Sequence, residues 1–249
     1  WHGATTVLFG NCGVGFAPCR PQDHDALIDL MEGVEDIPGI VLSEGLKWDW
    51  ESFPDFLDAV ERQPRAIDVG AQMPHHPLRV YVMGERAINF EDATEDDIAE
   101  MRKLTAEALQ AGAFGFTTSR TESHKTTKGE RVPGRYAAAE ELIGIGEAFK
   151  TVKHGAYGML NDFEDEAAEF DWMTKVGRAT GRPLWFLLTD RYSDPDRWRR
   201  LMGGVHKARH AGASVTAQIA GRQVGVILGL STSLTPFSAR PSFAALNWL

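Results

Sequence analysis

The pattern of apolar and polar positions predicts short strands that alternate with longer helices along most of the chain. Apolar, β-branched and aromatic runs predict strands at residues 5–9, 65–73, 113–119, 156–162, 183–190 and 214–220. Apolar residues at helical spacing predict helices at residues 23–31, 52–60, 95–110, 136–152, 165–180 and 196–210. A glycine separates helix from strand at several of these junctions. This βα repeat predicts a parallel sheet.

Two segments carry sharper expectations. The run Thr5–Phe9 is almost wholly apolar or β-branched, which favours a strand covered on both faces. The segment 32–50 is acidic, contains Gly and Trp and lacks a clear period, so it predicts a long loop or lid insertion.

Chemically active side chains follow nearly every predicted strand, and this favours a closed arrangement over an open sheet. These residues are Cys12, His75, Arg120, Asp162, Asp190 and Gln218. In a (β/α) barrel the carboxyl ends of all strands converge on one face. The chain also lacks a Gly-x-Gly-x-x-Gly or P-loop motif after a strand. The predicted fold class is therefore α/β, a TIM-type barrel.

Composition excludes several partner classes. The 249 residues are 43% hydrophobic, enough for a substantial core, and carry a formal charge of -9 without a basic block. Nucleic acid and anionic membranes are therefore not expected partners. The cysteines number only two, and no apolar run is long enough to span a bilayer. We expect a reducing, cytoplasmic location.

Cys12 lies in a glycine-rich turn after the first predicted strand, beside Gly10, Gly13 and Gly15. A cysteine at such a place has three possible roles: a small buried apolar residue, a metal ligand, or a nucleophile with His75 or His124 as its base. Spacing does not decide among them, because the chain has no His-x-His or His-Glu-x-x-His motif.

The polar run after the expected strand at residues 113–119 includes Arg120, His124 and Lys125. These side chains fit either a cationic pocket for a carboxylate or a solvated loop.

Several longer stretches resemble the N-acyl-D-amino-acid deacylase (D-aminoacylase) branch of the amidohydrolase superfamily. They are GNCGVGFAPCRP (10–21), LIDLMEGVEDIPG (27–39), PHHPLRVYVMG (74–84), EALQAGAFGFTTSRTESHK (107–125) and GERVPGRYAAAEEL (129–142). The resemblance implies zinc as cofactor and hydrolysis of the amide of N-acyl-D-amino acids or a related linear or cyclic amide, with a small N-acylated molecule as substrate. Residues 1–249 would then be part of a metal-dependent amidohydrolase barrel.

The resemblance also implies roles for single residues. The cysteine of the GNCG motif is a zinc ligand in that family, which carries over to Cys12. At the later strand ends, where the family has histidine ligands, Asp162 and Asp190 are the candidate replacements. We expect substrate contacts from Arg120, His124 and, at an earlier strand end, His75.

Other parts of the family pattern are not found in this chain. The His-x-His motif of the first barrel strand would precede residue 1, and the proton-transfer aspartate would follow residue 249. The expected barrel is therefore incomplete, lacking its first and last strands, and we expect its open edges to pair with another chain or with the rest of the protein. A catalytically inactive, amidohydrolase-like scaffold or subunit is the alternative function.

Overall fold

The computed structural model describes residues 3–191, 193–221, 229, 235–237 and 240–246. The chain divides into two compact units, Trp1–Gln218 and Ile219–Leu249. The second unit contains the short helix α10 (Pro241–Ala244). All the described strands and all candidate site residues belong to the first unit.

The first unit contains two parallel sheets. One sheet pairs β1 (Thr6–Phe9) with β2 (Asp68–Ala71). The other has the order β3–β4–β5–β6–β7, with strands Met73–Pro74, Gly115–Arg120, Ala156–Asn161, Leu184–Leu187 and Val215–Gln218. Every strand pair is parallel. The described strands do not close into a ring, which confirms the incomplete barrel expected from the sequence.

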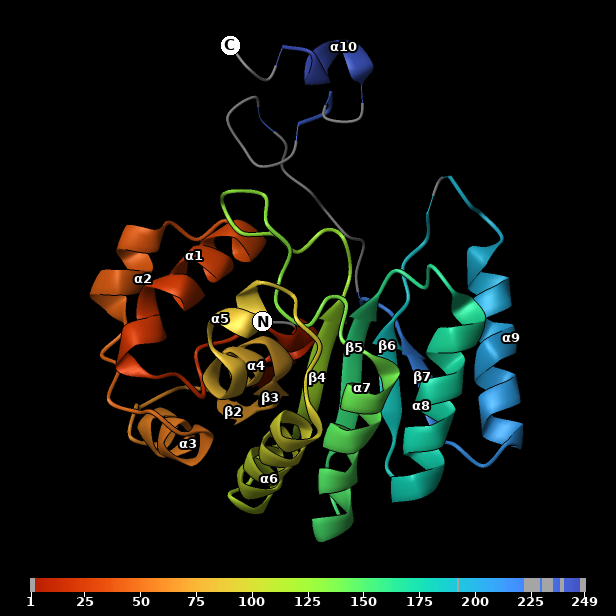
Figure 1. Cartoon of the computed structure of the whole chain (residues 1–249), viewed down its shortest axis with the longest axis horizontal. Helices are drawn as coiled ribbons and strands as arrows, with labels where there is room; N and C mark the ends of the chain where they lie inside the picture. Colours follow the sequence, from red (N-terminus) through yellow and green to blue (C-terminus); the bar gives the residue numbers. More distant parts are fainter. Residues whose placement is uncertain (1–2, 192, 222–228, 230–234, 238–239, 247–249) are drawn as a thin grey trace. The chain divides into compact units, whose positions relative to one another are not determined.

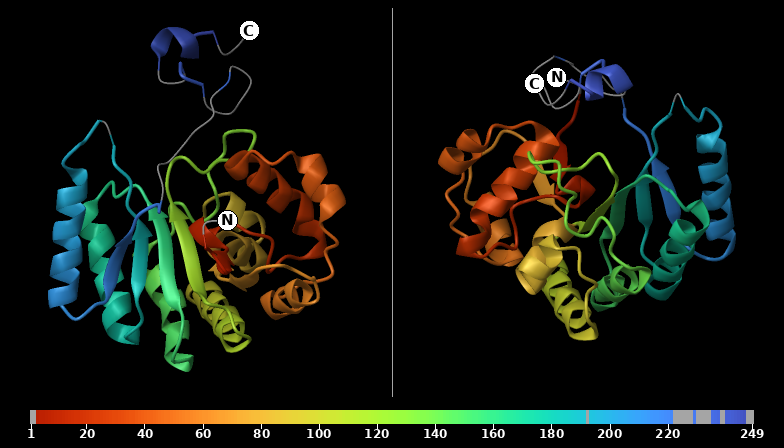
Figure 2. Two further views of the ribbon diagram at one scale, coloured as in Figure 1. Left: turned by 180° about the vertical axis from the view of Figure 1, so that it is seen from behind. Right: turned by 45° about the horizontal axis from the view of Figure 1, so that its top comes forward.

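Helices precede or follow most strands. Their bounds are η1 Asn11–Gly13, η2 Pro21–Asp23, α1 His24–Glu35, α2 Gly39–Gly45, α3 Phe53–Glu61, α4 His75–Met83, α5 Glu85–Ile88, α6 Glu95–Gln110, α7 Ala139–Gly146, η3 Glu147–Thr151, α8 Glu166–Thr180 and α9 Arg197–His210. The helices α6 to α9 stand in a row along one face of the five-stranded sheet (Figure 1). Seen from behind, the strands lie in front of these helices (Figure 2).

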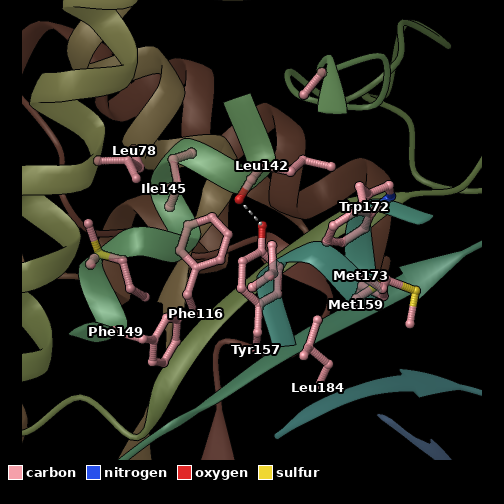
Figure 3. Packing of buried hydrophobic residues seen from close by; sticks show 14 of the residues in the cluster. Leu78, Phe116, Leu142, Ile145, Phe149, Tyr157, Met159, Trp172, Met173 and Leu184 are labelled. Atoms are coloured by element: carbon pink, nitrogen blue, oxygen red, sulfur yellow. Dashed lines mark hydrogen bonds between the residues drawn. The ribbon is translucent and has the colours of Figure 1, made fainter. Parts of the chain in front are cut away.

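The main core fills the space between the sheet and this row of helices. Phe116 and Tyr157 from neighbouring strands pack edge to face, and Tyr157 also contacts Trp172 of α8 (Figure 3). The Tyr157 hydroxyl donates to the Leu142 carbonyl of α7 at 3.4 Å. Burying aromatic side chains of this size dominates the stabilisation of such a core.

The opposite face of β5 and β6 is also apolar. Trp185 lies against Gly158, where an added Cβ would sit 2.1 Å from the indole ring. Side chains alternate along a strand, so Leu160 shares the face of Gly158, and Leu187 shares that of Trp185. This inner face of the sheet therefore carries no metal-binding side chain on β5 or β6 within their strand bounds.

The structure corrects three expectations. The strand β1 is not covered on both faces, since Val7 and Leu8 are 41% and 45% exposed and β1 pairs only with β2 among the described strands. The segment 32–50 is not one loop, because α1 runs to Glu35 and all of α2 lies within it. The helix expected at 136–152 is shorter and ends as the 3₁₀ helix η3.

Within the described part of the chain, the helices are all too short or too polar to cross a lipid bilayer.

Candidate functional site

The turn that carries Cys12 is built by glycines at the carboxyl end of β1. Gly10, Cys12 and Gly13 all have positive φ angles, of 85°, 66° and 75°. A Cβ on Gly13 would lie 2.7 Å from the Thr118 Cα, so only glycine lets η1 approach the end of β4 this closely. The Gly13 N–H also donates to the Thr117 hydroxyl at 3.2 Å. The backbone thus fixes Cys12 beside the last residues of β4.

The Cys12 side chain is half-buried, and its thiol is free. Burial, and secondarily the negative charge of Glu35, raise the pKa of this thiol to about 11. The thiol is therefore protonated at neutral pH unless a cation binds it. This state argues against an activated cysteine nucleophile, which needs a lowered pKa.

A serine and a histidine form a second element of the site. Ser119, near the end of β4, and His124, in the following loop, are joined by a hydrogen bond of 2.8 Å between Oγ and Nδ1. Burial lowers the pKa of His124 to about 4, opposed by the nearby charge of Asp162. His124 is therefore neutral at pH 7, with Nδ1 held by Ser119. His124 was predicted from the sequence, whereas Ser119 was not, because a serine in a strand that also contains threonines gives no separate signal.

His75 is fully buried within a polar network rather than open to a ligand. Its Nδ1 is 2.8 Å from the Thr118 hydroxyl, and its Nε2 is 2.8 Å from Glu141 Oε1. Arg79 Nε donates to the same Glu141 oxygen at 2.9 Å. Both ring nitrogens of His75 are occupied, which argues against the predicted substrate contact. Glu141 was missed because sequence alone does not reveal a partner 66 positions away.

Charges within this network stabilise one another. Burial lowers the pKa of His75, and the Glu141 carboxylate only partly offsets that effect. Burial alone would raise the pKa of Glu141, but the hydrogen bonds and positive charges of His75 and Arg79 hold it below its ordinary value. The neighbouring His76 is also fully buried, with Nδ1 bonded to the Pro133 carbonyl.

Arg120 is likewise engaged by protein groups. Its Nε lies 2.9 and 3.0 Å from the two Glu169 carboxylate oxygens, and its Nη2 lies 2.7 Å from Oε1. Its Nη1 donates to the Ala137 carbonyl at 2.8 Å. This bidentate, largely buried pair ties β4 to α8, which argues against Arg120 as a substrate contact.

Asp162, directly after β5, is also held by hydrogen bonds and an ion pair to other residues of the chain. Its carboxylate accepts hydrogen bonds from the Thr121 hydroxyl at 3.1 Å and the Glu122 N–H at 2.7 Å, and it pairs with Arg191. Burial would raise the pKa of Asp162, but these donors hold it below the ordinary value. Asp190 is exposed beyond the end of β6.

These positions test whether the chain can hold the predicted zinc ion. Among the residues that the structure describes, His, Cys, Asp and Glu side chains form no group of three or more that could hold a metal ion. The structure therefore does not bring Cys12, Asp162 and Asp190 together as a ligand set. Asp162 has its lone pairs committed to Thr121, Glu122 and Arg191. The described residues do not fit a complete zinc site. Cys12 is half-buried and Asp190 is exposed, and neither side chain has a hydrogen-bond partner among the described residues.

Comparison with known proteins places this geometry in a family. A family model described as "Amidohydrolase family" matches residues 1–248. D-aminoacylase from Alcaligenes xylosoxydans xylosoxydans is 30% identical over 188 residues, which are 74% of this chain and 33% of that protein. N-acyl-D-aspartate deacylase from the same organism is 36% identical over 117 residues, 47% of this chain and 21% of that protein.

Solved structures agree with this relationship. A crystal structure of D-aminoacylase matches with a TM-score of 0.64 and 25% identity, covering 87% of this chain and 41% of that one. N-acyl-D-glutamate deacylase from Bordetella bronchiseptica, complexed with zinc and a phosphonate inhibitor, gives the same values. The chain spans about a third of the length of the D-aminoacylase that it matches. Since the family model matches nearly every residue, the chain belongs to the amidohydrolase family.

Proposed function

We propose that this chain is part of a hydrolase that cleaves the amide bond of N-acyl-D-amino acids or related amides. The observation that carries the proposal is the Cys12 turn, held by glycine contacts at the carboxyl end of β4 within a chain of the amidohydrolase family. The names of its relatives support the substrate class, since they include a D-aminoacylase and two N-acyl-D-amino-acid deacylases.

Zinc is proposed for the whole protein rather than for this chain alone. One related structure is a zinc complex, and another describes a binuclear metal centre in D-aminoacylase. Cys12 is the donor that this chain would add, because its thiol is half-buried and has no hydrogen-bond partner among the described residues. Asp162 and Asp190 stay predictions as ligands, and the ion pair between Asp162 and Arg191 opposes the first of them.

His124 is the residue of this chain that best fits a substrate contact. Ser119 holds its Nδ1, which fixes the orientation of the ring and leaves Nε2 as the remaining polar atom. A neutral imidazole in this position can donate or accept one hydrogen bond from a substrate carbonyl or carboxylate. Arg120 and His75, the other two predicted contacts, hold the surrounding strands and helices in place instead.

The test is turnover of N-acetyl-D-amino acids by the full-length protein, with N-acetyl-L-amino acids as the comparison. We expect hydrolysis of the D series, lowered about 100-fold or more by Cys12→Ala, because loss of a direct ligand costs at least as much as loss of a residue that orients one. Cys19→Ala is the matched control, since Cys19 is also a free, buried cysteine but lies outside the turn. Hydrolysis that is unchanged in Cys12→Ala would contradict the proposal.

The second candidate function is an inactive scaffold or subunit. It is favoured by the absence of a three-ligand group among the described residues and by the closed Asp162–Arg191 pair. The two candidates differ in two respects: the scaffold does not retain zinc through purification, and it does not turn over any N-acyl amino acid. A cysteine hydrolase differs again, because thiol alkylation would abolish its activity while a chelator would leave it intact.

A further inference from the structure

A cavity of about 770 Å³ lies between α1, the turn after α5 and the segment that follows β4. Its walls come from residues 25–30 of α1, from Val80 and residues 88–90, and from residues 126–133. Cys12, Ser119 and His124 do not line it. The volume lies in the range of small-molecule binding pockets.

The floor of the cavity is apolar and its mouth is aromatic. Leu27, Leu30, Val80 and Pro133 are buried in the floor. Phe90 stands at the mouth with 37% of its surface exposed and a positive φ of 59°. A bulky side chain rarely adopts this backbone conformation, and such strained residues cluster at ligand-binding positions. The cavity thus offers apolar surface for the body of a ligand.

The two charged walls of the cavity have opposite sign. Asp25 and Asp29 lie one turn apart on the α1 wall, and Asp29 accepts a hydrogen bond from Thr127. The segment after β4, which contacts α1 through this hydrogen bond, lines the cavity with Lys128, Arg131 and Glu130. The first wall therefore has a formal charge of about -2 and the second about +1 at neutral pH. Arg131 is already bonded to Glu122 and to the Gly129 carbonyl, whereas Lys128 makes no ion pair among the described residues.

We propose that this cavity binds a free α-amino acid with a large apolar side chain, in its zwitterionic form. The ammonium group pairs with Asp25 and Asp29, the carboxylate pairs with Lys128, and the side chain packs on Leu27, Leu30 and Phe90. A ligand with a single charge would leave the charges of one wall unpaired, whereas a zwitterion pairs with both walls. The proposal rests on the cavity and not on the hydrolytic function, although a free amino acid is also the class of product that such hydrolysis releases.

Isothermal titration of the full-length protein tests the proposal with probes that are not N-acylated. The probes are D- and L-phenylalanine, phenylalaninamide, which lacks the carboxylate, and 3-phenylpropanoate, which lacks the amine. We expect saturable binding of at least one phenylalanine enantiomer and at least tenfold weaker binding of both singly charged probes. Equal binding of the amino acid and either singly charged probe would overturn the proposal, as would no saturable binding of either enantiomer.

Two exposed positions locate the site without disturbing the core. Asp25→Asn should weaken phenylalanine binding about tenfold and leave 3-phenylpropanoate unchanged, because it alters only the ammonium wall. Lys128→Met should weaken phenylalanine binding and leave the binding of phenylalaninamide unchanged.

The double variant Asp171→Asn, Lys175→Met is the matched control, since it removes the same two charges from an exposed ion pair on α8. Phenylalanine binding that survives both cavity variants would place the ligand elsewhere and overturn the assignment. None of these measurements requires turnover, so they can succeed where the proposed hydrolysis fails.

Discussion

The carboxyl ends of the strands differ sharply between the first half of the unit and the second. At β1 and β4 the glycine-built turn presents Cys12 with a half-buried thiol that accepts and donates no hydrogen bond among the described residues. After β5 the corresponding polar group is satisfied internally, since Asp162 is held by Thr121, Glu122 and Arg191, whereas Asp190 after β6 is exposed. The inner face there is filled by Leu160, Trp185 and Leu187.

The difference shows which half can still bind something. A metal or substrate needs a donor whose lone pair is not already committed, and a carboxylate with three protein donors gives up those bonds to bind anything else. We therefore propose that the chain's contribution to function lies on the β1–β4 side, and that Asp162 after β5 has a structural role.

The largest expected effect comes from the buried network beneath the β4 side. Glu141→Gln removes the charge that pairs with His75 and Arg79, both almost completely buried. We expect a loss of about 4 kcal/mol in the free energy of unfolding, because breaking a buried pair leaves an uncompensated charge. Denaturant unfolding measures this, with Glu100→Gln as the control, since its pair with Lys103 is exposed and should be worth under about 1 kcal/mol. Similar losses in the two variants would show that the network does not support the site.

Gly13→Ala tests whether backbone contact positions the Cys12 turn. The new Cβ would lie 2.7 to 2.9 Å from backbone atoms of Thr118 and Ser119, at a residue with φ of 75°. We expect a cost of about 3 kcal/mol from strain and clash together. Gly203→Ala, in helix α9 with no atom within 4 Å of the added Cβ, should be neutral or slightly stabilising. Thermal unfolding of the two variants separates these outcomes, and equal melting temperatures would refute the close-packed turn.

His124 should make stability depend on pH in a defined window. The pKa of His124 is about 4 in the folded chain and near 6.5 when unfolded, so the unfolded state binds more protons between these values. The stabilisation is fully present above about pH 6.5 and is lost as the pH falls toward 4. Allowing for partial exposure, we expect His124 to contribute about 2 kcal/mol of this loss. His124→Gln should flatten the profile of unfolding free energy in that window, and an unchanged slope would contradict the assignment.

The smallest effect is expected on the β5–β6 side. Asp162→Asn keeps the shape of the side chain but loses the charge opposite Arg191, whose side chain is 42% exposed. A partly exposed pair contributes about 1 kcal/mol, so unfolding at pH 7 should change by roughly that amount. Because the pKa of Asp162 is lowered in the folded chain, the contribution of this group is present above about pH 4 and disappears at lower pH. A loss of several kcal/mol at pH 7 would show that Asp162 does more than anchor the loop.

The sequence predicted the parallel βα order and the position of Cys12 because both depend on local signals. Apolar runs and glycine breaks mark the strands, and a capping box of Thr94 and Asp97 marks the start of α6. The partners of the polar side chains could not be predicted in this manner. Arg120 pairs with Glu169, and His75 pairs with Glu141, only after segments far apart in the sequence have packed together. The sequence therefore gave no sign that Arg120 and His75 are not free to bind a substrate.

The exposure of the first strand and the helices within residues 32–50 also could not be predicted from the local sequence. Val7 and Leu8 are apolar yet exposed, because burial depends on neighbouring strands and not on the run itself. The helix α2 was missed because Gly39 and Gly45 at its ends are weak helix formers. The pattern of apolar and polar residues therefore predicted most helices and strands, whereas tertiary packing determines which candidate residues are free to bind a metal or a substrate.

Zinc content of the purified full-length protein tests the contrast between the two strand-end regions most directly. It should be measured by mass spectrometry for the unmodified protein, Cys12→Ala and Asp162→Asn, each shown to be folded. We predict bound zinc in the unmodified protein and in Asp162→Asn, and its loss in Cys12→Ala. Zinc that persists in Cys12→Ala, disappears in Asp162→Asn, or is absent from the unmodified protein would contradict the account.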